Sequence, residues 1–328
     1  MSEVCIRHLG RSSNAADRGA MKVCVLQGGI GREREVSLQS GRCVAEALRA
    51  TGLDVVTSDI HPGDLTALDD DSIDVFFIAL HGEFGEDGQL QEILEGRGLA
   101  YTGSGPEASR LAFDKTASKR LFAQASVPTA PDVAFGPDGD VARLEALLGP
   151  LGERFVVKPV HQGSSVGVYI VSTVPEAVAA ARRVADEFGD CMIESFVEGR
   201  EMTVGVVGRQ ALPIIEIRSR SGFYDYHAKY VDEQTEYLFD TVEDAHVRQR
   251  VSESALACFD ALGCRHFARV DLILAADGLP YVLEVNTIPG FTTHSLLPKA
   301  AARTGLYMSE LCVRIAEQAC ATKGSRLK

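Results

Sequence analysis

The spacing of hydrophobic residues divides the chain into alternating short strands and helices. From residue 22, apolar runs of a few residues alternate with segments in which apolar positions recur every three or four residues, as at Val44 and Leu48. This alternation predicts a parallel sheet, so residues 21–114 are expected to form a doubly wound α/β domain. Its strands are predicted at 22–27, 55–60, 74–80 and 99–101, and its helices before residue 50, at 89–94 and at 106–124.

After residue 127 strands and helices alternate less regularly, and the pattern predicts two α+β domains. The first spans 115–200, with helices near 140–148 and 175–188 and strands at 155–160, 166–171 and 191–197. The second spans 201–328 and includes a polar, aromatic stretch at 219–240 without clear periodicity, which is typical of a lid loop. Residues 1–20 are expected to be a loose extension.

The segment from Arg269 to Gly290 is the most informative part of the sequence. Its two β-rich runs flank Asp277-Gly278, and a two-residue turn there would place Asp271 opposite Glu284 and Arg269 opposite Asn286. These four side chains would share one face. The other face would carry the apolar residues Val270, Leu272, Leu274, Tyr281, Leu283 and Val285. The polar face has the oxygen ligands expected for Mg²⁺ bound together with substrate phosphates. The alternative interpretation is a half-buried hairpin in which a salt bridge has only a structural role.

Composition narrows the class of protein. The 328 residues are 45% hydrophobic and 24% charged, which is typical of a globular protein of two or three domains. A net charge of -13 argues against broad nucleic-acid binding, and no apolar run is long enough to predict a membrane span. Eight cysteines without a CxxC pair predict reduced thiols and a cytoplasmic location.

Two glycine-containing loops are candidate anion sites. The glycines at 28, 29 and 31 follow a strand, but Arg34 stands where a dinucleotide fingerprint needs glycine, which disfavours a nicotinamide oxidoreductase. Glu35 in this loop either stabilises a helix start or holds a substrate ammonium. The loop from Lys158 to Gly167 offers donors to phosphate oxygens, or is simply a flexible turn.

Two further segments suggest a nucleotide. IESFVEGRE (193–201) contains Glu194 and Glu201, which are either exposed carboxylates or the polar edges of an adenosine slot near Val197. YDYHAKY (224–230) places aromatic residues and Lys229 in the predicted lid, where they contact phosphate or only hold the loop in place.

Taken in order, these segments resemble the ATP-grasp superfamily and, within it, the D-alanine–D-alanine ligase family. The resemblance rests on GGIGREREVSLQSG, HGEFGEDGQLQ, YTGSG, VVKPVHQGSSVGV, FYDYHAKY, RVD, LEVNTIPG and THSLLP, and it covers nearly all of 21–323. It implies three domains with ATP between the last two, and the joining of two D-alanines for peptidoglycan through an acyl phosphate.

The resemblance also implies roles for individual residues. Glu35 would hold the ammonium of the first D-alanine and, with Ser164 and Tyr230, form a hydrogen-bonded set. Arg269 and the Gly290 N–H would stabilise the oxyanion, Ser295 and Leu296 would bind the second carboxylate, and His81 would lie near the first subsite. Asp271, Glu284 and Asn286 would hold two Mg²⁺ ions, with Mn²⁺ as a substitute. The ATP contacts would be Lys115, Lys158 and Lys229 at the phosphates, with Phe196, Val197, Phe223, Ile273, Glu194 and Glu201 around the adenosine.

Two alternatives to this function differ in what they predict. A ligase that uses D-lactate or D-serine as acceptor is the nearer one, and Tyr230 favours D-alanine because relatives that use D-lactate tend to replace the tyrosine. A nucleotide sensor without catalytic activity would be expected to lack a metal ligand or the oxyanion arginine, and both are present. The family is commonly dimeric, so a homodimer is expected.

Overall fold

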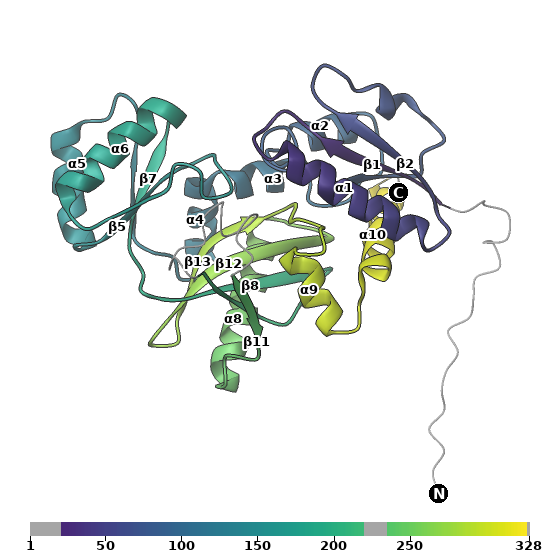
Figure 1. Cartoon of the computed structure of the whole chain (residues 1–328). Helices are drawn as coiled ribbons and strands as arrows, with labels where there is room; N and C mark the ends of the chain where they lie inside the picture. Colours follow the sequence, from purple (N-terminus) through teal and green to yellow (C-terminus); the bar gives the residue numbers. More distant parts are fainter. Residues whose placement is uncertain (1–20, 220–234, 327–328) are drawn as a thin grey trace, which may run out of the picture.

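The computed structural model describes residues 21–219 and 235–326 (Figure 1). The predicted extension at 1–20 and the lid residues Phe223, Lys229 and Tyr230 lie outside the described residues. The first unit contains a parallel sheet of order β2-β1-β3, in agreement with the predicted α/β fold. Its elements are β1 (Lys22–Gly28), α1 (Arg34–Arg49), β2 (Asp54–Ile60), a 3₁₀ turn (Thr66–Asp69), β3 (Val75–Ile78) and α2 (Gln89–Gly96).

Two short helices lead into the second unit, a four-stranded antiparallel sheet of order β4-β7-β5-β6. Apolar side chains of α5 and α6 pack on one face of this sheet together with Phe155, Val157 and Ile193. The opposite face carries Lys158 and Glu194. The elements are α3 (Pro106–Phe113), α4 (Lys115–Gln124), β4 (Asp132–Phe135), α5 (Val141–Leu148), a 3₁₀ turn (Gly149–Leu151), β5 (Phe155–Pro159), β6 (Tyr169–Val171), α6 (Val174–Phe188) and β7 (Cys191–Ser195).

The third unit is a larger antiparallel sheet of order β11-β10-β8-β12-β13, with β9 paired to β8. Helix α8 packs on one face of this sheet, and α9 contacts β8. The elements are β8 (Gly199–Val207), β9 (Gln210–Ala211), β10 (Ile215–Arg218), β11 (Glu236–Phe239), α8 (Ala245–Ala261), β12 (Phe267–Ala275), β13 (Pro280–Asn286), α9 (Leu296–Arg303) and α10 (Met308–Arg326).

The first and third units share one hydrophobic core. Helix α10 returns to the first unit and packs against α1, with Leu311 and Ile315 fully buried (Figure 1). Phe291, which follows β13, is also fully buried and lies edge-on to Phe77 of β3 and Phe267 of β12, at centroid distances of 5.5 and 5.4 Å. The two units therefore form one packed body, and the domain boundaries at 114 and 200 remain predictions.

The central hairpin has the predicted pairing but not the predicted turn. Asp271 is opposite Glu284 and Arg269 is opposite Asn286, as expected. The register shifts after Asp271, and the loop is closed by hydrogen bonds between residues 275 and 279, which leaves three residues in the turn. A bulge in β13 compensates for the longer turn. As a result Val282 is buried in the core where Tyr281 and Leu283 were predicted, and these two are only half-buried.

Three smaller predictions about local structure were wrong. The helix predicted at 106–124 is two helices, because Asp114 has an extended conformation (φ -89°, ψ 101°) and caps α4 through the N–H of Ala117. The strand predicted at 99–101 is reduced to one bridge between Tyr101 and Phe76. The lid stretch predicted at 219–240 includes strand β11, which pairs with β10.

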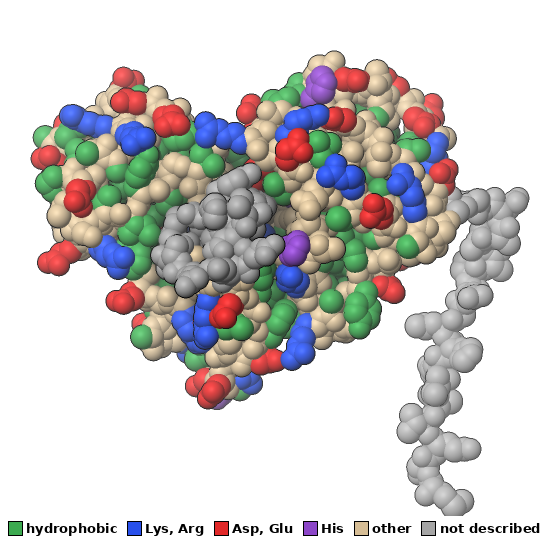
Figure 2. All heavy atoms as spheres, in the orientation of Figure 1, with side chains coloured by type: hydrophobic (Ala, Val, Ile, Leu, Met, Phe, Trp, Pro, Cys, Tyr) green, Lys and Arg blue, Asp and Glu red, His purple; other side chains and the backbone are tan. Residues whose placement is uncertain are grey.

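The distribution of charge on the surface and the state of the cysteines agree with what the composition predicts. Side chains of both charges are interspersed over the face shown in Figure 2. Within the described residues, no helix is long and apolar enough to cross a membrane. The seven described cysteines are not joined to one another in disulfides. Burial raises the pKa of Cys24 and Cys191 to about 12, so both are protonated thiols at neutral pH.

Two glycines that flank α2 allow a test of the packing between α2 and α3. Gly88 and Gly98 both have positive φ (90° and 65°), but a Cβ on Gly88 would lie 2.5 Å from the carbonyl oxygen of Pro106, whereas Gly98 has open space. Gly88→Ala is therefore expected to lower the free energy of unfolding by about 1–3 kcal/mol more than Gly98→Ala. Urea denaturation of both variants measures the difference, and equal losses would contradict the close contact.

Candidate active site

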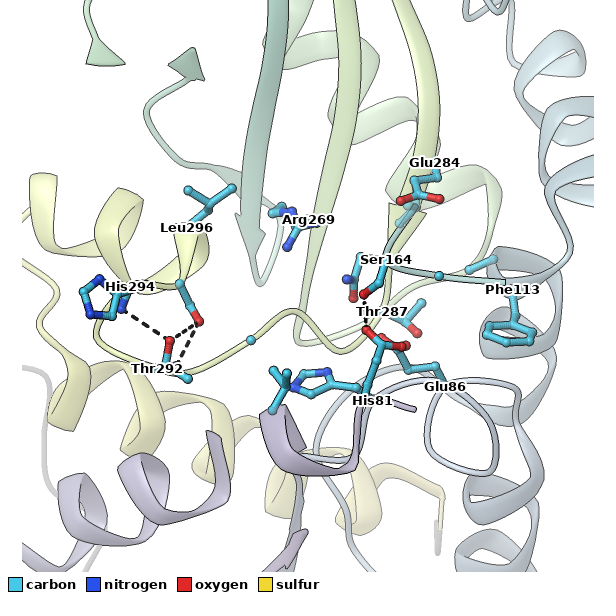
Figure 3. A pocket seen from close by; sticks show the side chains of 18 of the residues that line it. His81, Glu86, Phe113, Ser164, Arg269, Glu284, Thr287, Thr292, His294 and Leu296 are labelled. Carbon is cyan, nitrogen blue, oxygen red and sulfur yellow. Dashed lines mark hydrogen bonds between the residues drawn. The ribbon is translucent and has the colours of Figure 1, made fainter. Parts of the chain in front are cut away.

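A pocket lies where the three units meet. Figure 3 shows His81 and Glu86 on one side, Arg269 and Glu284 on the strands opposite, and Ser164 between them. The predicted site residues that line this pocket are His81, Lys115, Ser164, Arg269, Glu284, Asn286, Gly290, Ser295 and Leu296. The structure thus brings together side chains that are up to 215 residues apart in the sequence (81 to 296).

Glu33, and not Glu35, is the carboxylate that reaches this pocket. Ser164 was predicted to join Glu35, but its hydroxyl donates a hydrogen bond to Glu33. Glu33 precedes the first residue of α1 and has non-helical torsions (φ -91°, ψ 11°), whereas Glu35 lies in the first helical turn and is exposed. Glu35 therefore corresponds to the alternative considered for it, an acidic residue that stabilises the helix start.

Burial shifts the pKa values of two residues in the pocket, Glu86 and His81. The Gly82 N–H donates to Glu86 at 2.7 Å, but burial, reinforced by nearby Glu33, raises the pKa of Glu86 well above its usual range. Burial lowers the pKa of His81, although Glu33 acts in the opposite direction. The His81 Nε2 lies 3.2 Å from the hydroxyl of Ser40. A neutral imidazole and a carboxyl group that binds a proton readily are thus adjacent to the Glu33 carboxylate.

Lys158 is held by a buried ion network that includes a lysine absent from the prediction. Glu194 lies 2.6 Å from Lys158 and 2.7 Å from Lys119, and it is 3% exposed. Burial alone would raise the pKa of Glu194, but the two lysines outweigh it and hold the pKa below its usual value. Lys119 also contacts Asp132 and the carbonyl of Ala130. Glu194 therefore positions two cations, and its predicted contact with adenosine remains untested.

Lys115 joins the second unit to the third. Its ammonium donates to the carbonyl of Gln162 at 2.6 Å and lies 3.3 Å from Glu284. Lys115 and Lys119 are four residues apart on α4, so both project from the same face of that helix. This spacing, immediately after the helix cap, is the sequence signal that identifies Lys119.

The polar face of the hairpin carries an arginine–aspartate pair. Arg269 donates to both carboxylate oxygens of Asp271, at 2.9 and 2.7 Å, and Thr203 of β8 donates to Oδ1 at 2.6 Å. Glu284 lies opposite Asp271 on β13, and Asn286 lies two residues further along the same strand. Asp271, Glu284 and Asn286 supply the hard oxygen donors that Mg²⁺ prefers, so this set fits the predicted metal. Among residues 21–219 and 235–326, no group of three or more His, Cys, Asp or Glu side chains is arranged to hold a metal, and here the third donor is an amide.

The segment after β13 is tightly folded against α9. The Ser295 hydroxyl accepts a hydrogen bond from the Thr292 N–H at 2.9 Å, and a Cβ on Gly290 would lie 2.6 Å from this same hydroxyl. Phe291 donates its N–H to Ser40 at 3.3 Å. A larger residue at 290 would require the Ser295 hydroxyl to move. Thr292 and His294 also line the pocket and were not predicted.

Apart from Phe223, which is not described, the residues predicted around the adenosine lie outside the lining of this pocket. Ile273 pairs with Glu201 across β12 and β8, and both are half-buried. Phe196 and Val197 follow β7 and are half-buried, with the guanidinium of Arg154 3.8 Å from the ring centroid of Phe196. The pocket lining also excludes Lys158, Glu194 and Asp271, which lie behind it in the networks described above.

Known proteins are similar to this chain in sequence and in overall fold. Residues 64–104 match the family model described as D-ala D-ala ligase N-terminus, and 121–317 match D-ala D-ala ligase C-terminus. The D-alanine--D-alanine ligase of Anaeromyxobacter sp. (strain K) is 44% identical over 299 residues, which cover 91% of this chain and 96% of that protein. The chain belongs to the D-alanine–D-alanine ligase family. The D-alanine--D-alanine ligase of Methylacidiphilum infernorum (isolate V4) is 38% identical, over 90% of this chain and 94% of its own length.

Solved structures of this ligase family superpose over nearly the whole chain. The Bacillus anthracis D-alanine--D-alanine ligase complexed with ATP has a TM-score of 0.82 at 32% identity, covering 94% of this chain and all of that one. The VanG D-Ala:D-Ser ligase from Enterococcus faecalis has a TM-score of 0.80 at 28% identity, covering 92% and 100%. The overall fold of these ligases is therefore the same for two different acceptors.

The raised pKa of Glu86 predicts a pH-dependent gain in stability for Glu86→Gln. A group whose pKa is raised by folding stabilises the protein below its unfolded pKa, and this stability is lost as the pH rises through the folded pKa. Glutamine keeps an acceptor for the Gly82 N–H but does not ionise. The melting temperature of Glu86→Gln relative to wild type should therefore increase as the pH rises above about 4.5.

Thermal melting between acidic and mildly alkaline pH measures this difference. Glu83→Gln is the matched control, because it removes the same charge from an exposed position in the same loop. A Glu86→Gln curve parallel to that of wild type at every pH would contradict the predicted linkage.

Proposed function

We propose that this protein joins two D-alanines into D-alanyl-D-alanine with hydrolysis of ATP to ADP and phosphate, for peptidoglycan precursor synthesis. The observation that carries this proposal is the convergence of Glu33, Ser164 and Arg269, each from a different unit, on one pocket. Membership of the ligase family and the similarity to a relative solved with ATP support the same reaction.

In the proposed reaction the carboxylate of the first D-alanine attacks the γ-phosphate of ATP and forms an acyl phosphate. Glu33 holds the ammonium of this substrate in place of the predicted Glu35, and His81 lies beside it. The amine of the second D-alanine, held through its carboxylate by Ser295 and Leu296, then attacks the acyl carbon, and phosphate leaves. Arg269 and the Gly290 N–H donate to the oxygen that gains charge.

The lysines and the polar hairpin face bear the phosphate charge. Phosphoryl transfer depends mainly on positioning and charge neutralisation, which Lys115, Lys158 and Lys229 supply at the phosphates. Asp271, Glu284 and Asn286 would hold two Mg²⁺ ions, with Mn²⁺ as a substitute. When bound, these ions neutralise charge on the phosphate oxygens.

Three further properties belong to this proposal. The protein acts in the cytoplasm, where its thiols stay reduced. It forms a homodimer. Its acceptor is D-alanine, and Tyr230 is the residue expected to favour D-alanine over D-lactate. D-serine is the specific alternative, because a D-Ala:D-Ser ligase shares the fold.

The function is tested by phosphate release from ATP and Mg²⁺ with D-alanine alone, with L-alanine, and with D-alanine plus D-lactate or D-serine. We expect turnover with D-alanine and no turnover with L-alanine. In mixtures of acceptors, D-alanyl-D-alanine should be the main product. Glu284→Gln should abolish turnover, because it removes an oxygen charge from the metal set. Tight ATP binding without turnover on any amino acid would instead favour the nucleotide sensor.

The assignment of Glu33 is tested against Glu35 directly. Glu33→Gln is expected to raise the KM for the first D-alanine by about 100-fold, because it removes the carboxylate that pairs with the substrate ammonium. Glu35→Gln removes the same charge from an exposed helix position and should leave KM and kcat unchanged. Initial rates over a range of D-alanine concentrations separate the two variants, and a large effect of Glu35→Gln alone would restore the original prediction.

A further inference from the structure

Thr203 lies on the site face of β8, beside the proposed metal ligands. Its neighbours Met202 and Val204 point into the core that packs against α8, so Thr203 projects from the opposite face. In the sheet register Thr203 is the cross-strand partner of Asp271, which in turn pairs with Glu284. The three side chains form one row across β8, β12 and β13.

The hydroxyl of Thr203 is buried, and its hydrogen-bond partners lie on the neighbouring strand β12. Thr203 is 1% exposed, and its Oγ1 lies 2.6 Å from Asp271 Oδ1 and 3.3 Å from the carbonyl of Val270. A buried hydroxyl needs a partner, and an apolar β-branched residue such as valine would fill the same strand position without one. The distinctive feature of Thr203 is therefore its hydroxyl and not its volume.

Asp271 has a second partner, but that partner has another task. Arg269 donates to both oxygens of Asp271, and in the proposed reaction the same guanidinium also donates to the substrate oxygen that gains charge. The two bonds to Asp271 use two of its five N–H donors, so the orientation of the guanidinium is shared between Asp271 and the substrate. Thr203 contacts no substrate group in the proposed reaction, and its β-branched side chain has few rotamers. It can hold the Asp271 carboxylate in one orientation throughout turnover.

We propose that Thr203 is a positioning residue for divalent-metal binding, which orients Asp271 through its hydroxyl. This inference rests on the proposed function for the identity of the metal site. Hydrogen-bond partners behind a metal ligand typically change metal affinity by about 10–100-fold. Because Thr203 acts through Asp271, its loss should weaken metal binding while leaving D-alanine binding intact.

The test compares Thr203→Val, which removes the hydroxyl, with Thr203→Ser, which retains it and removes only the methyl group. Wild-type turnover with D-alanine is measured first, so that the function is tested separately. Mn²⁺ binding to each ADP-saturated protein is then measured by electron paramagnetic resonance of free Mn²⁺. The free Mg²⁺ concentration for half-maximal turnover and the KM for D-alanine complete the set.

Thr203→Val is expected to weaken Mn²⁺ binding, and to raise the half-saturating Mg²⁺ concentration, by about tenfold. The KM for D-alanine should not change, and Thr203→Ser should resemble wild type. Equal Mn²⁺ affinity in wild type and Thr203→Val would overturn the proposal, as would an equal loss in Thr203→Ser. If wild type showed no turnover with D-alanine but Thr203→Val still weakened Mn²⁺ binding, the proposed function would fail and the positioning role would stand.

Discussion

The site depends on the packing of one phenylalanine between two sheets. Phe291 contacts Phe77 of the parallel sheet and Phe267 of the antiparallel sheet, both in edge-on geometry, and all three rings are buried. Such aromatic pairs contribute about 0.5–1.5 kcal/mol each beyond the burial of their area. Because Gly290 directly precedes Phe291, this contact also restricts the backbone at Gly290, whose N–H is a donor in the proposed reaction. The first unit, which carries Glu33 and His81, is thereby held at a set position relative to the hairpin.

Around this frame, buried and half-buried charges are paired, and the pairs of Glu194 and Glu284 link different elements. Glu194 of β7 faces Lys119 and Lys158, Asp271 faces Arg269, and Glu284 faces Lys115. An unpaired buried charge is strongly unfavourable, so each pair restricts the elements that contribute to it. The pairs also prepare the site for its ligands. A polyphosphate and its metal ions carry both signs of charge, and they can replace the intramolecular partners of Lys115 and Glu284 without leaving either group uncompensated.

The sequence predicted the fold class and most elements because the hydrophobic period changes clearly along the chain. It also predicted the pairing of Asp271 with Glu284, although two errors cancelled there: the turn has one more residue than expected, and the bulge in β13 restores the register. The predicted contact of Glu35 with Ser164 was wrong for a different reason, because Glu33 makes this contact. The two glutamates are separated by one residue at a helix start, and only the backbone torsions of Glu33, which no periodicity reveals, direct its carboxylate toward Ser164. Glu86 was missed because its raised pKa comes from burial and from charges on segments distant in sequence, Glu33 and Glu284, which periodicity does not reveal.

Acceptor choice must reside in a few contacts rather than in the fold. The chain superposes on a D-Ala:D-Ser ligase with a TM-score of 0.80 and on a D-alanine--D-alanine ligase with 0.82, so one overall fold is shared by ligases named for two different acceptors. One small substituent in an apolar pocket changes discrimination by only about 1–3 kcal/mol, whereas a hydroxyl that must be hydrogen-bonded changes it more. In the proposed reaction the second D-alanine is held by Ser295 and Leu296, and the Ser295 hydroxyl is hydrogen-bonded to Thr292 within the same short segment. If the proposed reaction holds, substitutions in that segment would alter the acceptor, while the ion pairs and the proposed metal ligands, which lie on other elements, would continue to support formation of the acyl phosphate.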